Sequence, residues 1–489
     1  MTWKWSDEQI AIFDAVAHAP GEHIVVTARA GAAKTTSAIE AVARSPYHRV
    51  MMLVYNKDTA EDLQKRLVKG EARTSHALGF RLLKQAKRAT EVDKMRPRRL
   101  AEQALKDCRV KVRRESLRPL TELIDLAKEA RPTVSAAADL KSLVEGSGLD
   151  LETSTPADRL AEVVFHAMAL ARSTKDGKIS FADMVWLPVV EGLVRPLYDE
   201  VVIDEAQDQS RAQLHIAFGV CADRIIMVGD SKQCIYSWRG ADSGSMERVR
   251  EALRARALTL TTTFRCARKV VEKAQTLVPD IRAREGAPEG VVRSSSFQRM
   301  LAELRPGDFV LSRVNAPLIG VCLDLLRREI PSTISGTDIG QALARLVESL
   351  GKGMSAGQLK VNVAAWASRE RARVASQDDD ARAVRAVNDK EQAILVLASG
   401  LQTVDEVIAR IDALFSAEDD ARVVTCATVF AAKGRERERV FLLEDSFLRK
   451  QRVNGEVRLV AREGEEEDNI RYVAYTRAKN ELVLVEGGA

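Results

Sequence analysis

Two adjacent carboxylates, Asp204 and Glu205, are the residues of this 489-residue sequence whose positions most clearly indicate chemistry. They follow the apolar run 201–203, which is too short for a helix and predicts a buried parallel strand. A second apolar run, 225–228, leads to Asp230, and open α/β sheets bind ligands where their strands end. Asp204 is suited to hold Mg²⁺ and Glu205 to accept a proton from attacking water, which indicates a magnesium–nucleotide site. The alternative is a pair of solvated acids in a loop.

A phosphate-binding loop upstream favours the nucleotide site. Residues 26–36 follow an apolar strand expected at 24–26 and approach the pattern of a glycine, four residues and Gly-Lys-[Ser/Thr]. In this pattern backbone N–H groups cradle the phosphates. Lys34 fits the contact with the β- and γ-phosphates, and Thr35 fits the contact with magnesium. The residues expected to contact the nucleotide are Ala30, Gly31, Ala32, Ala33, Lys34, Thr35 and Thr36.

The loop departs from the pattern at both glycine positions, which are occupied by Ala28 and Ala33. Gly31 still permits a close backbone approach or a positive φ, whereas Ala33 carries a Cβ where glycine would be free. Because a methyl group crowds the loop without removing a charge, we expect ATP hydrolysis to persist with a weaker affinity for the nucleotide.

Together these segments resemble the UvrD/Rep-like superfamily 1 DNA helicases, in a compact form. Ordered matching blocks run from Gln9 to Lys479, with two unmatched insertions between them. The most specific block is Gly-Asp-Ser-Lys-Gln-Cys-Ile-Tyr-Ser-Trp-Arg-Gly at 229–240. The resemblance implies an α/β fold of two RecA-like P-loop NTPase domains with parallel sheets, carrying two mainly helical insertions.

The resemblance also implies how the chain is divided. The expected parts are 1–85 and 176–263 for the first RecA-like domain (1A), 86–175 for the helical insertion 1B, 264–349 and 421–489 for the second RecA-like domain (2A), and 350–420 for a short helical 2B-like insertion. Because this last insertion is much shorter than a full 2B domain, the capacity for strand separation is an open question.

Three residues outside the loop are expected, by resemblance, to contact the nucleoside of ATP. Gln9 stands where the family reads the adenine edge, Phe264 where an aromatic ring stacks on adenine, and Glu436 where a carboxylate binds the ribose. Without the loop that follows it, Gln9 would be interpreted as an ordinary exposed helix residue.

Three further residues are expected at the γ-phosphate. Gln233 and Arg265 occupy the positions of γ-phosphate contacts, and Arg477 that of an arginine finger supplied by the second RecA-like domain. Such a finger stabilises charge in the transition state and is worth about 10³–10⁵ in rate. With the lysine and the two carboxylates above, these residues form the expected catalytic set.

Contacts with DNA are expected after two segments of the first domain. The strand expected at 50–54 leads to Tyr55, which is suited to stack on a base, and to Asn56 or Lys57, either of which is suited to contact phosphate. Thr74 and His76 resemble contacts of the family with the DNA backbone. A lone histidine in such a place is more often a packing residue, so that interpretation of His76 stays open.

Three more aromatic residues are expected to lie against the DNA strand. Tyr236 and Trp238 are two residues apart, so both would face one side of an extended segment. Aromatic rings stack on bases regardless of sequence, with about 1–3 kcal/mol for each. The alternative is a core tryptophan beside a core tyrosine. Phe430 stands where the family commonly has histidine, and an aromatic ring there could still contact DNA.

Net charge alone does not argue for nucleic acid, because 75 basic and 70 acidic residues give only +5. Between Lys84 and Arg118, however, acidic residues are few. The basic residues of this stretch are Lys87, Arg88, Lys94, Arg96, Arg98, Arg99, Lys106, Arg109, Lys111, Arg113 and Arg114. The stretch is either a solvated helix face or a surface along which a DNA strand passes.

Cysteine spacing and hydropathy argue against other classes of protein. The six cysteines are scattered, with no Cys-x-x-Cys pair, which argues against zinc, an iron–sulfur cluster or a disulfide framework. No apolar run approaches the ~20 residues that span a bilayer, and the N-terminus lacks a signal-peptide core. We therefore expect a cytoplasmic protein with no membrane partner.

By resemblance, the sequence predicts an ATP-dependent DNA helicase that uses ATP with Mg²⁺, moves 3′ to 5′ along single-stranded DNA and acts at single-strand/duplex junctions. Two alternatives stay open. The short 2B-like insertion favours a translocase that removes bound proteins with little unwinding. Ala28, Ala33 and Phe430 favour a catalytically weak DNA-binding homologue.

Overall fold

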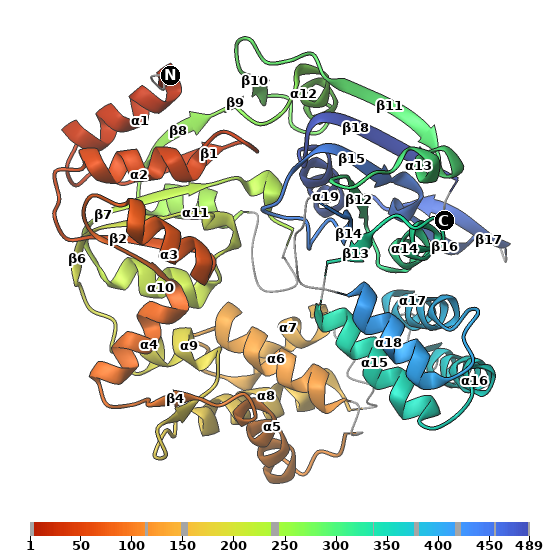
Figure 1. The fold of residues 1–489 in the computed structure, drawn as a ribbon. Coiled ribbons are helices and arrows are strands. Elements are labelled where there is room, and N and C mark those ends of the chain that lie inside the picture. The colour runs from red at the N-terminus through yellow and green to blue at the C-terminus, as the bar shows by residue number, and fades with distance from the viewer. Residues whose placement is uncertain are drawn as a thin grey trace. The chain divides into compact units, whose positions relative to one another are not determined.

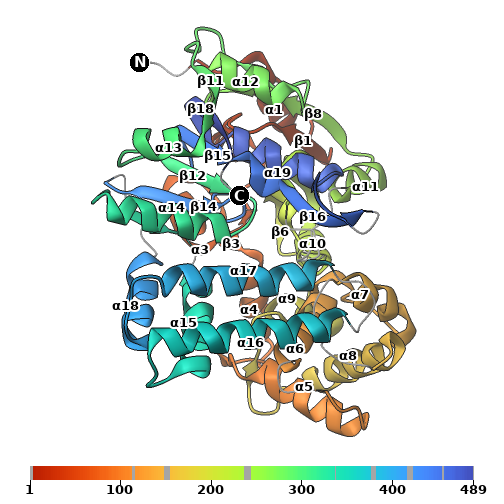
Figure 2. The same ribbon diagram turned by 90° about the vertical axis from the view of Figure 1, so that its right-hand side faces the viewer.

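The computed structural model of the protein describes residues 4–112, 116–147, 155–235, 244–335, 337–375, 381–415, 422–453 and 456–487. The chain folds into two compact units, Met1–Thr261 and Thr262–Ala489, each built on a six-stranded sheet (Figures 1 and 2). All neighbouring strands of the two sheets are parallel, which confirms the predicted α/β class with two parallel-sheet domains. Across the described ranges, no helix combines the length and the apolar character needed to cross a membrane.

The sheet of the first unit has the strand order β3-β2-β6-β7-β1-β8. Its strands are β1 (Ile24–Ala28), β2 (Val50–Val54), β3 (Glu71–Thr74), β6 (Tyr198–Ile203), β7 (Cys221–Gly229) and β8 (Arg256–Leu260). Every residue of β2 is buried, as expected for a central parallel strand that is covered on both faces. The short apolar runs of the sequence therefore mark the strands of this sheet.

Helices cover both faces of this sheet. One face packs against α1 (Asp7–His18), α2 (Lys34–Arg44) and α3 (Lys57–Arg66). The other face packs against α4 (Ser75–Gln85), α9 (Asp183–Val190), α10 (Arg211–Gly219) and α11 (Ser245–Ala252). Successive side chains of β1 and β2 alternate between the two cores, as the period of a strand requires.

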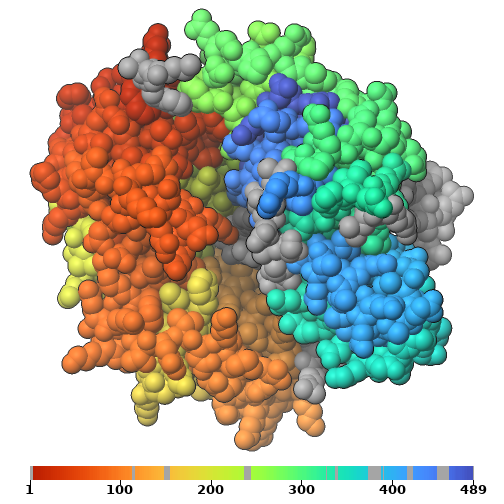
Figure 3. Space-filling view, in the orientation of Figure 1, coloured from red at the N-terminus to blue at the C-terminus, as the bar shows by residue number. Residues whose placement is uncertain are grey.

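A helical subdomain lies between α4 and α9 in the chain. It contains β4 (Glu91–Val92), α5 (Arg96–Asp107), α6 (Leu117–Ala130), α7 (Lys141–Gly146), α8 (Ala157–Ala171) and β5 (Lys178–Ile179). These helices share one apolar core, to which α9 contributes Met184, Trp186 and Leu187. In Figure 3 the orange atoms of this subdomain form the lower part of the visible surface of the first unit.

Buried charges join the subdomain to the helices of the sheet. The carboxylate of Asp183 in α9 accepts hydrogen bonds from Lys128 Nζ of α6 at 2.6 Å and from Arg96 Nε of α5 at 3.3 Å. Burial alone would raise the pKa of Asp183, but Lys128, the N–H of Ser180 and Arg96 together lower it. A charged carboxylate thus fixes α5 and α6 against α9.

The sheet of the second unit has the strand order β11-β18-β15-β12-β14-β13. Its strands are β11 (Val291–Ser296), β12 (Phe309–Ser312), β13 (Ser332–Ile334), β14 (Val424–Thr428), β15 (Arg437–Leu443) and β18 (Ala478–Glu486). The helices that accompany this sheet are α12 (Arg268–Gln275), α13 (Phe297–Glu303), α14 (Ala316–Arg327) and α19 (Glu465–Tyr475). Two small pairs complete it: β9 (Thr262–Thr263) with β10 (Arg282–Ala283), and the antiparallel hairpin of β16 (Leu448–Val453) and β17 (Glu456–Ala461).

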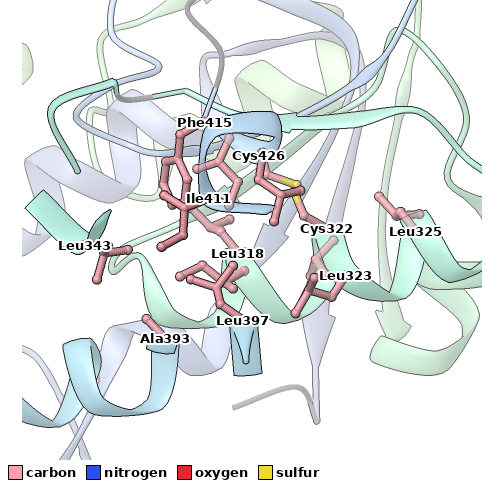
Figure 4. Close-up of a cluster of buried hydrophobic side chains, with 14 of the residues drawn as sticks. Leu318, Cys322, Leu323, Leu325, Leu343, Ala393, Leu397, Ile411, Phe415 and Cys426 are labelled. Carbon is pink, nitrogen blue, oxygen red and sulfur yellow. The ribbon is translucent and has the colours of Figure 1, made fainter. Parts of the chain in front are cut away.

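Four helices stand between β13 and β14 in the chain. They are α15 (Thr337–Gly351), α16 (Ala356–Ala375), α17 (Ala381–Leu397) and α18 (Val404–Leu414), so the helical insertion begins before the expected residue 350. Leu343, Leu397 and Ile411 of this insertion lie in one apolar cluster with Leu318 of α14 and Cys426 of β14 (Figure 4). The insertion is therefore built onto the core of the second sheet.

Candidate nucleotide and DNA sites

The phosphate loop connects β1 to α2 at the carboxyl end of the first sheet. Lys34 begins α2, and Ala33 before it has a left-handed backbone with φ 57° and ψ 39°. Gly31 also has a positive φ, of 72°. The other expected loop contacts are Ala30 and Ala32, which are buried, and Thr36, which is half-buried. A residue with a Cβ costs roughly 1–2 kcal/mol in the left-handed region, so Ala33 holds a conformation that favours glycine.

The loop lysine and the expected general base lie together. Lys34 Nζ is 3.6 Å from Glu205 Oε1, and Lys34 is almost fully buried. Glu205 is the second residue after β6 and has a positive φ of 50°, which turns the chain sharply just beyond the strand end. Phosphate oxygens bound in the loop would compete with Glu205 for the ammonium group of Lys34, because both are anions.

Thr35 and Asp204, the expected magnesium ligands, contact each other. Thr35 Oγ1 donates a hydrogen bond to Asp204 Oδ2 at 2.7 Å, and the N–H of Glu205 donates to Oδ1 at 3.0 Å. Burial, followed by the neighbouring charge of Glu205, raises the pKa of Asp204 to about 6. A hydroxyl and a carboxylate oxygen this close are ligands of the type that Mg²⁺ prefers, and a cation would offset the buried charge. The residues present therefore fit magnesium.

Gln207 belongs to this cluster, although the sequence analysis did not single it out. Its Nε2 donates to Glu205 Oε2 at 2.6 Å, and its Oε1 accepts from the N–H of Asp230 at 2.9 Å. A Cβ on Gly229 would lie 2.5 Å from Gln207 Oε1, so a larger residue at the end of β7 would displace the Gln207 amide. Gln207 orients the expected base. Its position two residues after Glu205 was the feature of the sequence that could have identified it.

Gln9 is fully buried and acts as a structural residue of α1. Its Oε1 accepts from the N–H of Ser6 at 3.0 Å in a capping box, and its Nε2 donates to Ser37 Oγ at 2.9 Å. The amide is therefore satisfied within the protein and presents no exposed atom to an adenine. Gln9 is thus not the exposed helix residue of the alternative interpretation, and the adenine contact stays a prediction.

Arg265 and Glu436 of the second unit bond each other. Arg265 Nε lies 2.5 Å from Glu436 Oε2, and Arg265 Nη1 donates to the carbonyl of Thr476 at 3.2 Å. Lys479 Nζ is 3.6 Å from the other oxygen of Glu436. Phe264, half-buried, precedes Arg265 in the chain. Residues expected to bind phosphate and ribose are thus paired with each other in this structure.

Arg477, the expected arginine finger, is buried. Its Nε donates to the carbonyl of Val473 at 2.9 Å, and its Nη2 donates to Thr476 Oγ1 at 3.3 Å. Burial, together with the nearby charge of Arg265, lowers the pKa of Arg477 to about 9. The side chain would have to leave these contacts to reach a phosphate, so the finger role stays a prediction.

Two of the expected DNA contacts have structural roles as helix caps. Asn56 Oδ1 accepts from the N–H of Thr59 at 2.8 Å at the start of α3, and Thr74 Oγ1 accepts from the N–H of Ala77 at 3.1 Å at the start of α4. Side-chain caps of this kind satisfy the free N–H groups of a helix. Tyr55, in contrast, is 42% exposed at the carboxyl end of β2, which leaves its ring accessible for stacking.

His76 stacks on Phe181, which the sequence analysis had not singled out. The ring centroids are 4.0 Å apart and the rings are inclined by 19°. Burial lowers the pKa of His76 to about 4, so its imidazole is neutral at physiological pH. Phe181 is 60% exposed and presents the accessible aromatic surface of the pair. Any DNA contact by His76 is therefore that of a neutral ring.

The remaining expected aromatic contacts are only partly covered by the structure. Tyr236 and Trp238 lie outside the described residues. The guanidinium of Arg313 lies over the ring of half-buried Phe430, 4.9 Å from its centroid. Phe430 is thus packed beside a cation within the second unit, and its contact with DNA stays a prediction.

The basic stretch between Lys84 and Arg118 is partly neutralised. Arg88 pairs with Glu191, Arg96 with Asp183, Arg98 with Glu102 and Arg99 with Asp93. The exposed basic side chains of the expected set that have no ion pair within the described part of the chain are Lys87, Lys94, Lys106, Arg109 and Lys111. Arg113 and Arg114 lie outside that part. These ion pairs offset part of the positive charge of the stretch, and its contact with a DNA strand stays a prediction.

Two family models match the chain. Residues 10–254 match the UvrD/REP helicase N-terminal domain, and residues 385–486 match the UvrD-like helicase C-terminal domain. The first match contains the phosphate loop and the carboxylate pair, and the second contains Glu436 and Arg477.

Curated relatives extend these matches. F-box DNA helicase protein 1 of Schizosaccharomyces pombe is 24% identical over 506 residues, which cover 95% of this chain and 56% of that protein. DNA helicase II of Salmonella typhimurium is 24% identical over 358 residues, covering 65% of this chain and 48% of that protein. RecBCD enzyme subunit RecB of Mycobacterium tuberculosis is 30% identical over 175 residues, covering 33% of this chain and 16% of that protein. The chain spans about half the length of the first two relatives.

Replacing Ala33 by glycine tests the strain in the loop. Because glycine adopts a positive φ without cost, we expect Ala33→Gly to leave the KM for ATP unchanged or to lower it by no more than about tenfold. The measurement is steady-state ATP hydrolysis with single-stranded DNA. Ala38→Gly, within α2, is the matched control, since glycine there weakens the helix and removes one buried methyl group but leaves the loop unchanged. A large rise in KM for Ala33→Gly would contradict this account.

The buried imidazole of His76 predicts a pH-dependent stability. Its folded pKa of about 4 lies below the unfolded value of about 6.5, so its contribution is complete above pH ~6.5 and is lost as the pH falls toward ~4. Between about pH 7.5 and about pH 5, this residue should lower the free energy of unfolding by about 2 kcal/mol.

Urea unfolding of the wild type and of His76→Phe at both pH values measures this contribution. The variant should lose about 2 kcal/mol less than the wild type, because phenylalanine does not titrate. Replacing the exposed His48 by glutamine should leave the wild-type loss unchanged. Equal losses for the wild type and His76→Phe would show that His76 titrates normally.

Proposed function

Because the chain belongs to the UvrD/REP helicase family, we propose that it is an ATP-dependent DNA helicase and translocase that moves 3′ to 5′ on single-stranded DNA. One observation carries the proposal. Lys34 and Thr35 of the phosphate loop lie 3.6 Å from Glu205 and 2.7 Å from Asp204, respectively. This is the set of charges and hydroxyls that the hydrolysis of a nucleotide needs at one place.

The first unit binds ATP and activates water in this proposal. The N–H groups of the loop and Lys34 hold the phosphates, which draw the ammonium group away from Glu205. Glu205, oriented by Gln207, then accepts the proton of the attacking water. Thr35 and Asp204 would hold Mg²⁺, which when bound would neutralise charge on the phosphate oxygens.

The second unit supplies positive charge for the transition state in this proposal. Arg265 exchanges Glu436 for a phosphate oxygen, and Glu436 is then free to accept a hydrogen bond from the ribose. Arg477 leaves its backbone contacts to act as the finger. Internal partners hold both arginines in this structure. Either ATP alone replaces these partners, or a bound DNA strand contributes to their replacement.

Single-stranded DNA is the proposed track, with single-strand/duplex junctions as the sites of unwinding. Exposed Tyr55 is suited to stack on a base, and Trp238 is proposed to do the same. Opening and closing around ATP would alternate the grip of such residues and so move the strand. We further propose that the protein works in the cytoplasm.

A translocase that clears proteins from single strands is the second candidate. It is favoured by the helical insertion α15–α18, whose side chains share one core with α14 and β14. An insertion fixed in this way has less freedom to swing against a duplex than a separate domain has. The direction of movement and the nucleotide chemistry are the same in both candidates.

Duplexes with a single-stranded tail distinguish these candidates. With ATP and Mg²⁺, we expect the protein to unwind a duplex with a 3′ tail and to leave the same duplex with a 5′ tail at the background level. Lys34→Met is the inactive control, because it removes the charge that holds the phosphates.

Release of streptavidin from a biotin at one end of a single strand tests movement without unwinding. Release from the 5′ end together with no unwinding would favour the translocase. Unwinding from a 5′ tail would contradict the proposed direction.

A further inference from the structure

A second cation of the phosphate loop, Arg29, reaches across the sheet edge. Its Nη1 donates to Asp230 Oδ1 at 2.9 Å, and the Arg29 side chain is only 12% exposed. Asp230 follows β7, the strand that pairs with β1 next to the loop (Figure 1). The contact therefore joins the loop that is proposed to hold ATP to the segment that begins after β7.

Asp230 in turn fixes the expected γ-phosphate sensor. Its Oδ2 accepts from Gln233 Nε2 at 2.8 Å, and its Oδ1 also accepts from the N–H of Lys232 at 3.2 Å. Gln233 is itself buried, and its N–H donates to the carbonyl of Asp230 at 2.8 Å. The orientation of the Gln233 amide thus depends on where the Asp230 carboxylate is held.

Asp230 is also connected, through Gln207, to Glu205, the expected general base. The N–H of Asp230 donates to Gln207 Oε1, and Gln207 Nε2 donates to Glu205 Oε2, which leads back to Lys34. Arg29 and Lys34 are thus the two ends of one chain of polar contacts that starts and finishes in the phosphate loop. Asp230 is fully buried, and a buried carboxylate without a cation is strongly destabilised. Arg29 supplies that cation.

We propose that Arg29 is a positioning residue that holds Gln233, through Asp230, ready to bind the γ-phosphate, and that it thereby sets the discrimination between ATP and ADP. The inference rests on the proposed function, because it assigns the γ-phosphate contact to Gln233. Arg29 acts through Asp230, and the α- and β-phosphates are held by Lys34 and the loop N–H groups.

Equilibrium binding of fluorescent ADP and of a non-hydrolysable fluorescent ATP analogue, both with Mg²⁺, tests this role. In Arg29→Met we expect the affinity for ADP to stay close to that of the wild type, while the affinity for the ATP analogue falls about tenfold. Arg29→Lys keeps a charge but not the geometry of the guanidinium, so it should retain part of the discrimination. Arg66→Met is the matched control, because Arg66 forms an exposed pair with Asp62 in α3.

The double variant Arg29→Met/Asp230→Asn guards against misfolding, since it leaves no unpaired buried charge. It should also lose discrimination, because residue 230 is no longer held from the loop. An equal loss of affinity for both nucleotides would show that Arg29 only shapes the loop, and unchanged binding of both would show that it has no role; either result overturns the inference. A wild type that binds neither nucleotide would refute the proposed function itself.

Discussion

Buried opposite charges at the carboxyl ends of β1, β6 and β7 are the constraint on which the first unit depends. Asp204 and Asp230 are both fully enclosed, and a buried charge without partners costs several kcal/mol. Thr35 and Arg29 of the phosphate loop supply donors to them, so the loop must lie across the ends of the strands. The strand order places β7 between β6 and β1 and brings these ends into register.

The second unit also provides partners for its charged site residues, and it does so with residues of its own sheet domain. Arg265 and Glu436 neutralise each other, and Arg477 is enclosed among backbone carbonyls. Each of these charges therefore has a partner within its own unit, and in the proposed mechanism ATP would replace internal partners in both units. Such replacement is a physical route by which binding energy can drive a change of conformation.

Local signals in the sequence were sufficient to predict the strands and the polar residues at their ends. Apolar runs such as 50–54 and 201–203 predict buried strands because a parallel strand covered on both faces is apolar throughout. The residues after them, among them Asp204 and Glu205, then lie at one edge of the sheet by topology alone.

Contacts between distant segments were not predictable in this way. Arg29 and Asp230 are 201 positions apart, and nothing in either segment indicates that one neutralises the other. The burial of Arg477 and the pairing of Arg88 with Glu191 likewise depend on how whole helices pack. A single sequence shows which residues carry charge, but it does not show which of those charges remain available for DNA or ATP.

The rate of ATP hydrolysis with and without single-stranded DNA, compared between the wild type and Glu205→Gln, tests the central claim most directly. The account predicts strong stimulation by DNA in the wild type and a loss of about 10²–10⁴ in the variant, because the substitution removes the proton acceptor and keeps its size. Comparable rates in the two proteins, or no hydrolysis by the wild type, would contradict it.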